Sequence, residues 1–149
     1  MNKDLLRQEL AEDEGCKYEI YLDHLGLPTF GIGHLITEDD PDYGQEVGTT
    51  VTQERVQAVF NRDIAVTLED CFRLYSGFSE LPEEVQRIVA NMCFNLGYPR
   101  LSKFKGMKAA VEEADWNRAA DEMVDSKWYQ QVPNRARRLE KRMRAVAEE

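Results

Sequence analysis

Three side chains near the start of the chain are candidates for cleaving a glycosidic bond, namely Glu14, Asp23 and Thr29. Such cleavage needs a carboxylic acid to protonate the leaving oxygen and a carboxylate to activate water or attack the sugar. The chain holds 28 Asp and Glu residues, so a pair of carboxylates carries no information by itself. The case for these three residues therefore depends on whether the surrounding helices and strands bring them together.

The expected elements could bring these side chains together. Residues 3–13 have the apolar spacing of an amphipathic helix, and Glu14 stands at its end. Residues 17–22 alternate as in a short strand, and Asp23 follows at the turn. Residues 29–34 are expected to form the return strand, with the hydroxyl of Thr at its start and two glycines that indicate a bulge or a close backbone approach. Folded back on one another, these elements would surround one cleft.

The rest of the chain is mainly helical. An acidic loop over residues 38–46, which we expect to be a solvated surface, separates the hairpin from a long helix capped by Thr52. Leu81-Pro82 opens an apolar helix, with the proline at its first position, and we expect this helix to be central and buried and to end at Gly97. Further helices are predicted over residues 105–114, 115–124, 126–131 and 133–145.

These elements predict a single α+β domain, mainly helical, over residues 1–149. We expect a β-containing N-terminal lobe over 15–51, a linking helix over 52–76, and a helical C-terminal lobe over 77–149 that packs with the helix at 3–13. The hydrophobic fraction of 42% excludes most disordered proteins. No segment has the roughly 18–20 apolar residues of a membrane helix, and the charged start predicts no signal peptide.

The charge and the cysteine and histidine residues bear on whether the protein binds nucleic acid, forms disulfides or holds a metal ion. The net charge is −9, whereas residues 135–149 hold six basic and three acidic residues, a segment that suits either nucleic-acid binding or a solvated helix face. The acidic remainder disfavours nucleic acid. The three cysteines, Cys16, Cys71 and Cys93, predict buried thiols in a reducing compartment. The spacing of His24 and His34 predicts no metal site.

Three blocks in the same order resemble the phage-type lysozymes, which are muramidases. In the first block, Glu14 is followed after eight residues by Asp23, after five more by Thr29, and then by Gly-x-Gly-His. The second block is Asn-Met-Cys-Phe-Asn-Leu-Gly at 91–97, and the third is Ser-Lys-Trp-Tyr-Gln-Gln-Val-Pro-Asn-Arg-Ala-Arg-Arg at 126–138. Together the blocks span most of the chain.

The resemblance implies a lysozyme-like fold, with a small β-hairpin lobe, a larger helical lobe, a long helix joining them and an active-site cleft between them. It implies hydrolysis of the β-1,4 bond between N-acetylmuramic acid and N-acetylglucosamine in peptidoglycan. Glu14 would be the general acid, and Asp23 and Thr29 would position or activate water. The family is described as inverting, which requires the two carboxyl groups to lie roughly 6.5–9.5 Å apart.

The resemblance also assigns supporting roles. Arg135 matches an arginine near the catalytic acid, where it would orient the carboxyl group, and His34 and Asp63 match an ion pair. Leu35 and Phe94 match cleft-lining positions that would bind substrate.

The chain departs from the family at other positions. Met107 and Glu122 replace small polar residues of the cleft, and the acidic loop is unlike that of the familiar member and shorter. Subsite contacts therefore differ from those of the family, whereas the three catalytic residues are intact. A weakly catalytic or inactive lysozyme-fold domain for peptidoglycan binding or scaffolding is the alternative to an enzyme.

The expected partner is bacterial peptidoglycan, with no cofactor, no metal, no nucleic acid and no stable membrane insertion. We expect a monomer that is made in the cytoplasm, the host cytoplasm if the protein is phage-encoded, and that acts on the cell wall after release. The net charge of −9 predicts weak long-range capture of an anionic wall, and activity that salt inhibits little or even aids.

Overall fold

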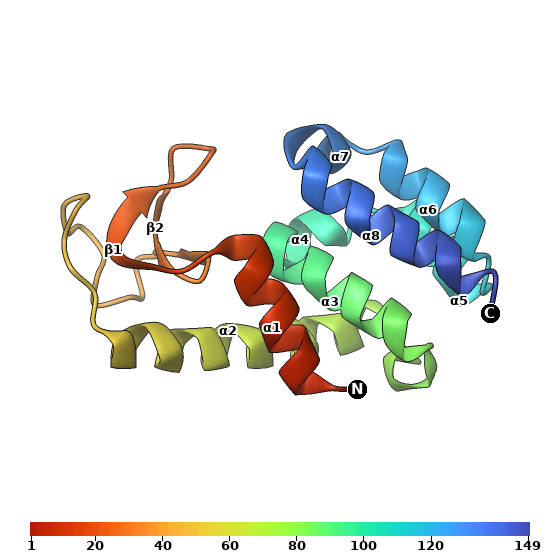
Figure 1. Ribbon diagram of the computed structural model, residues 1–149, viewed down its shortest axis with the longest axis horizontal. Coiled ribbons are helices and arrows are strands. Elements are labelled where there is room, and N and C mark those ends of the chain that lie inside the picture. The colour runs from red at the N-terminus through yellow and green to blue at the C-terminus, as the bar shows by residue number, and fades with distance from the viewer. The chain divides into compact units, whose positions relative to one another are not determined.

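The computed structural model describes residues 1–149 and contains eight α-helices and one three-stranded antiparallel sheet. The chain divides into two compact units (Figure 1). We call Asp4–Val66 the sheet unit, and Met1–Lys3 with Thr67–Glu149 the helical unit. The predicted mainly helical α+β class is confirmed. The predicted lobe boundaries stay a prediction, since the two units meet within one helix.

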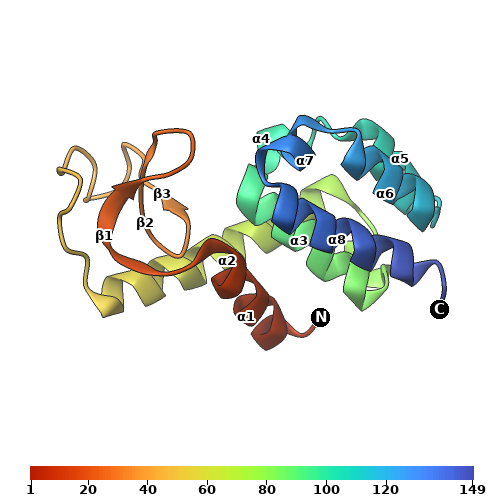
Figure 2. The same cartoon turned by 45° about the horizontal axis from the view of Figure 1, so that its top comes forward.

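The sheet unit begins with the predicted helix and hairpin. Its elements are α1 (Lys3–Glu14), β1 (Lys17–Leu22), β2 (Pro28–Gly31) and β3 (His34–Leu35), with the strands in the order β1-β2-β3 (Figure 2). The prediction of one return strand over 29–34 is wrong. Gly31 and Gly33 adopt φ values of +63° and +66°, so the chain leaves β2 and turns back as a third strand. Such φ values cost little for glycine, because it has no Cβ.

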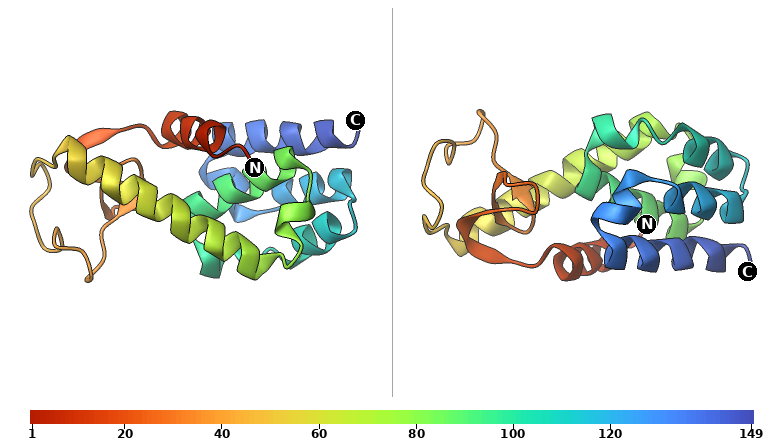
Figure 3. Two further views of the ribbon diagram at one scale, coloured as in Figure 1. Left: turned by 90° about the horizontal axis from the view of Figure 1, so that it is seen from below. Right: turned by 90° about the horizontal axis from the view of Figure 1, so that it is seen from above.

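Helix α2 (Gln53–Leu74) is the longest element and runs unbroken (Figure 3). As predicted, Thr52 caps its start: the Thr52 hydroxyl oxygen accepts a hydrogen bond from the Arg55 backbone N–H at 3.1 Å. A cap of this kind contributes about 1 kcal/mol of stability. Within the sheet unit, the buried apolar side chains come from α1, from the sheet with its connections, and from α2, namely Leu6, Leu10, Ile20, Phe30, Ile32, Ile36, Val51, Val56, Val59, Phe60 and Ile64.

The helical unit contains the helices that the sequence predicted. These are α3 (Glu83–Leu96), α5 (Lys105–Glu112), α6 (Trp116–Val124), α7 (Lys127–Gln131) and α8 (Pro133–Val146). Ten of the 14 residues of α3 are buried, which confirms it as a buried helix that ends at Gly97. Pro82 is the N-cap of α3 rather than its first residue. The short elements η1 (Phe78–Glu80) and α4 (Tyr98–Leu101) were not predicted.

Charge differs sharply between the two units. The sheet unit holds 14 acidic and four basic residues, a net charge of −10, whereas the helical unit holds 14 acidic and 15 basic residues, a net charge of +1. The basic segment 135–149 is only partly a solvated face. Arg135 is buried, Arg142 pairs with Glu84, and Arg144 pairs with Asp121 and Glu140.

The thiols also differ from the expectation of three buried cysteines. Cys71 and Cys93 are buried, whereas Cys16, which lies in the link between α1 and β1, is exposed. None of the helices combines the length and the apolar character that crossing a membrane would need.

Candidate active site

Glu14 is the last residue of α1, and its side chain is half-buried. Gly15 follows with a φ of +72° and ends the helix by donating its N–H to the Ala11 carbonyl at 2.9 Å. The Glu14 carboxyl group lies against the backbone at Gly33, where an added Cβ would lie 2.5 Å from Glu14 Oε1 and 2.7 Å from Cδ. A side chain at position 33 would therefore displace this carboxyl group from its present position, and the φ of +66° at Gly33 also favours glycine.

Asp23 closes the turn between β1 and β2. Its Oδ1 accepts hydrogen bonds from the backbone N–H groups of Leu25 at 2.8 Å and Leu27 at 2.9 Å. This arrangement is an Asx-type turn, in which a short side chain substitutes for a backbone acceptor. No protein group donates to Oδ2, so this oxygen of the half-buried carboxylate is available for chemistry.

Thr29 lies in a row of three side chains that crosses the sheet. It pairs with Tyr21 in β1 and with Leu35 in β3, and directly opposite residues of antiparallel strands point to the same face. Thr29 is 3% exposed, and its hydroxyl donates to the Leu27 carbonyl at 2.9 Å, so only the lone pairs of this hydroxyl remain for other partners. Leu35 is 45% exposed, as a residue that contacts a ligand can be.

Tyr21 is a residue of this region that the sequence reasoning missed. Burial raises the pKa of its phenol first, and the neighbouring Glu14, Asp23 and Cys16 raise it further. Both candidate carboxylates therefore lie close enough to act on the same side chain. The signal that marks Tyr21 is its register opposite Thr29, which the folded hairpin shows and which an irregularity between Lys17 and Tyr21 hides in the sequence.

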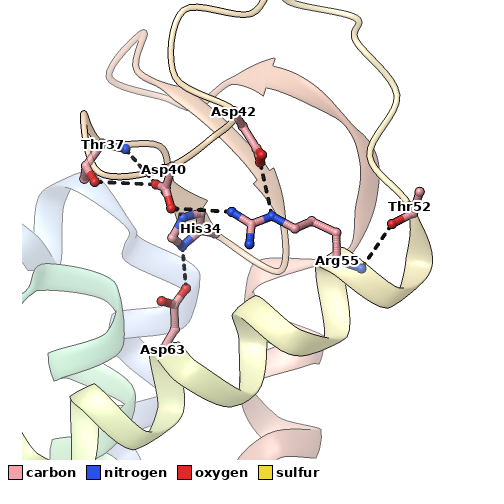
Figure 4. A network of polar contacts seen from close by, with 7 residues as sticks. All are labelled: His34, Thr37, Asp40, Asp42, Thr52, Arg55 and Asp63. Carbon is pink, nitrogen blue, oxygen red and sulfur yellow. Dashed lines mark hydrogen bonds and ion pairs between the residues drawn. The ribbon is translucent and has the colours of Figure 1, made fainter.

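His34 forms the predicted pair with Asp63 and a second pair that was not predicted (Figure 4). His34 Nδ1 lies 2.7 Å from Asp63 Oδ2 on α2, and Nε2 lies 2.9 Å from Asp40 Oδ2 in the following loop. Burial alone lowers the pKa of His34, but the hydrogen bonds and charges of the two carboxylates outweigh burial and raise it. The imidazole thus links β3, α2 and the acidic loop.

Most residues of the acidic loop 38–46 are exposed, as expected, but two of its carboxylates anchor it to the rest of the unit. Asp40 is 8% exposed and accepts a hydrogen bond from the Thr37 backbone N–H at 2.9 Å. Arg55 Nε bonds to Asp42 Oδ2 at 3.3 Å, and Arg55 Nη2 lies 3.6 Å from Asp40 Oδ1 (Figure 4). Burial raises the pKa of Asp40, yet the Thr37 hydrogen bond, the His34 contact and the Arg55 charge lower it overall.

The remaining predicted site residues belong to the helical unit. Arg135 is buried, and its Nε donates to Asn91 Oδ1 at 2.8 Å. Phe94 is half-buried. Of the two departures from the family pattern, Met107 is 1% exposed, whereas Glu122 lines a pocket with several residues, Lys103 and Lys105 among them.

Comparison with known proteins identifies the family. The profile described as "Phage lysozyme" matches residues 11–145. The chain is 32% identical over 153 residues to probable T4-type lysozyme 2 of Dictyostelium discoideum. This alignment covers 90% of each protein. It is 31% identical to the pre-baseplate central spike protein Gp5 of Enterobacteria phage T4, over 90% of this chain and 26% of the spike protein. It is 30% identical to the peptidoglycan hydrolase gp36 of Pseudomonas phage phiKMV, over 92% of this chain and 15% of that protein. The chain belongs to the phage lysozyme family and is a lysozyme-type glycoside hydrolase.

Proposed function

We propose that the protein is a muramidase that hydrolyses the β-1,4 bond between N-acetylmuramic acid and N-acetylglucosamine in bacterial peptidoglycan. The observation that carries the proposal is that the three residues meet at one small sheet. The Glu14 carboxyl group lies against Gly33 in the β2–β3 turn, Asp23 closes the β1–β2 turn, and Thr29 lies in β2 between these turns. The relatives named as a T4-type lysozyme and a peptidoglycan hydrolase support the substrate class.

In the proposed reaction Glu14 gives its proton to the leaving glycosidic oxygen as the bond from that oxygen to the anomeric carbon breaks. Water attacks the anomeric carbon from the opposite side, and Asp23 accepts the proton through Oδ2, its uncommitted oxygen. Thr29 can only accept a hydrogen bond from this water, because its own proton is donated to Leu27. Inversion at the anomeric carbon would place the two carboxyl groups roughly 6.5–9.5 Å apart, with room for the water.

Other residues support this chemistry in the same proposal. Leu35 and Phe94 would contact the saccharide, and Arg135, held by Asn91, would support the catalytic acid. His34 and Asp63 would hold the β-lobe to α2 rather than take part in the reaction. We further propose a monomer that is made in the cytoplasm, acts on the wall after release, and needs no cofactor.

The experiment is the clearing of a peptidoglycan suspension by wild-type protein and by Glu14→Gln. Removing the general acid is expected to lower the clearing rate by about 10²–10⁴-fold. Borohydride reduction of the products should give reduced N-acetylmuramic acid, which identifies the bond that was cut. Equal melting temperatures would show that the variant is folded.

Two results would contradict the proposal. Equal clearing by both proteins would remove Glu14 from the mechanism. No clearing by either protein, combined with co-sedimentation of wild type with the suspension, would instead favour the alternative of a lysozyme-fold binding or scaffold domain.

A further inference from the structure

We propose that Tyr21 is a fourth member of the water site, whose phenol hydroxyl donates a hydrogen bond to the attacking water and fixes its orientation. The inference rests on the proposed muramidase reaction and adds a residue to it. It is carried by the position of Tyr21 in the sheet, by the free proton of its hydroxyl and by the way its ring is held.

The strand register places Tyr21 at the water site. Tyr21 and Thr29 are directly opposite in β1 and β2, so their Cβ atoms lie about 4.5–5.5 Å apart on one face of the sheet. Asp23 follows two residues after Tyr21, where the strand turns. A water that contacts both Thr29 and Asp23 therefore lies within reach of a side chain as long as tyrosine.

The phenol remains a hydrogen-bond donor in this setting. Four charged or titratable side chains surround Tyr21, namely Glu14, Cys16, Asp23 and the ammonium group of Lys17. Burial and the three acidic groups raise the pKa of Tyr21 above its ordinary value of 10.0. The hydroxyl thus keeps its proton, so it can donate a hydrogen bond, which a carboxylate cannot do.

The proton of this hydroxyl is not used within the protein. No protein group accepts a hydrogen bond from Tyr21 Oη, whereas Thr29 donates its hydroxyl proton to the Leu27 carbonyl. Lys17 Nζ lies 4.3 Å from the centroid of the Tyr21 ring, a cation–π contact that restrains the ring. The side chain is therefore held in place while its polar end stays available.

The attacking water needs such a donor to be held in one orientation. A water molecule has two protons and two lone pairs. In the proposed reaction the two O–H groups of the water donate hydrogen bonds to Asp23 and Thr29, one lone pair forms the bond to the anomeric carbon, and only Asp23 takes up a proton. The hydroxyl of Tyr21 would occupy the second lone pair, which leaves the first directed at the sugar. Orientation of this kind lowers the barrier by removing rotational freedom before the reaction.

Tyr21→Phe tests this role, because the ring and its contact with Lys17 remain and only the hydroxyl is lost. We expect kcat on a soluble peptidoglycan oligosaccharide to fall about three- to tenfold, the effect of one neutral hydrogen bond. KM and the melting temperature should not change. The matched control is Tyr18→Phe: Tyr18 lies in the same strand and is 45% exposed, and Glu14 and Asp23 are not among the causes of its pKa shift. This control should keep wild-type kcat.

The outcomes separate the two proposals. A Tyr21→Phe variant whose kcat matches wild type overturns the role of Tyr21 alone, and so does a rise in KM with unchanged kcat, because a contact to the ground-state sugar would act in that way. Wild-type protein that releases no saccharide, or a Glu14→Gln variant as active as wild type, overturns the proposed reaction itself.

Discussion

At the scale of single residues, Asp23 uses its two carboxylate oxygens in different ways. Oδ1 holds the hairpin turn through two backbone N–H groups, at 2.8 Å and 2.9 Å, while Oδ2 has no protein donor. Asp23 thus has a structural role in the turn and a proposed chemical role as the base. A substitution that keeps an oxygen acceptor in the turn but removes the negative charge can distinguish the two roles.

We predict that Asp23→Asn lowers the peptidoglycan clearing rate at least about 100-fold, because the amide cannot accept a proton from water. The amide keeps an oxygen that can accept from Leu25 and Leu27, so the free energy of unfolding in urea should stay near the wild-type value. Asp23→Ala removes both hydrogen bonds and should lose about 1–3 kcal/mol as well. An active Asp23→Asn protein would show that the negative charge is not required.

The three proposed catalytic residues could be selected from the sequence, whereas Tyr21 could not. The spacing of Glu14, Asp23 and Thr29 matches a family pattern that is visible along the chain. The contribution of Tyr21 depends on which β2 residue lies opposite it, and a one-residue change of register would turn it to the other face. The irregularity between Lys17 and Tyr21 makes that register hard to derive from alternation alone.

At the scale of elements, the connection between β2 and β3 shows how local and distant constraints combine. The glycines in the predicted strand 29–34 correctly indicated a close approach, but not which group approaches. The structure places the Glu14 carboxyl group against Gly33, in a turn that two positive φ values create. The sequence alone could not predict the third strand, because β3 has only two residues and no period to detect.

The contacts of His34 join β3, the acidic loop and α2, and they should make stability depend on pH. The pKa of His34 is raised in the folded state. The stabilisation is therefore complete below the unfolded pKa of 6.5 and is lost as the pH rises through the higher folded value. The pKa of Asp40 is lowered, so its contribution is present above 3.8 and is lost as the pH falls through the folded value.

We predict that the free energy of unfolding in urea declines from about pH 6.5 upwards, on the alkaline side of its maximum. In Asp40→Asn one of the two carboxylates that raise the pKa of His34 is gone, so the decline should be smaller and should end at a lower pH. His24→Gln is the matched control, since His24 is the other histidine and is exposed. A decline of the same size in Asp40→Asn and in wild type would rule out this linkage.

At the scale of the whole molecule, the charge of −9 is a property of one unit. The sheet unit carries −10 and the helical unit +1, although each holds 14 acidic residues. Composition alone could show that the C-terminal segment is basic, but not that Arg142 and Arg144 form ion pairs within the fold. The bulk charge therefore describes the surroundings of the proposed catalytic residues more than those of the helical unit.

We predict that the clearing rate stays constant or rises when NaCl increases from about 10 mM to about 100 mM, since the Debye length falls from roughly 30 Å to roughly 10 Å. Screening would weaken the repulsion between the sheet unit and an anionic wall. Neutralising three exposed carboxylates of the acidic loop, with Glu38→Gln, Asp39→Asn and Glu46→Gln, should raise the rate at low salt and flatten its salt dependence. A steep fall in the wild-type rate with salt would mean that attraction, not repulsion, governs capture.

The distribution of the three cysteines leaves one thiol near the proposed site that can be labelled selectively. Cys71 and Cys93 are buried, and Cys16 alone is exposed, two residues after Glu14. A maleimide dye or spin label applied to the native protein will therefore attach at one position, beside the reacting groups, without any engineered cysteine. We expect a saccharide bound at the proposed site to slow the alkylation of this thiol, so that the rate of alkylation would report binding.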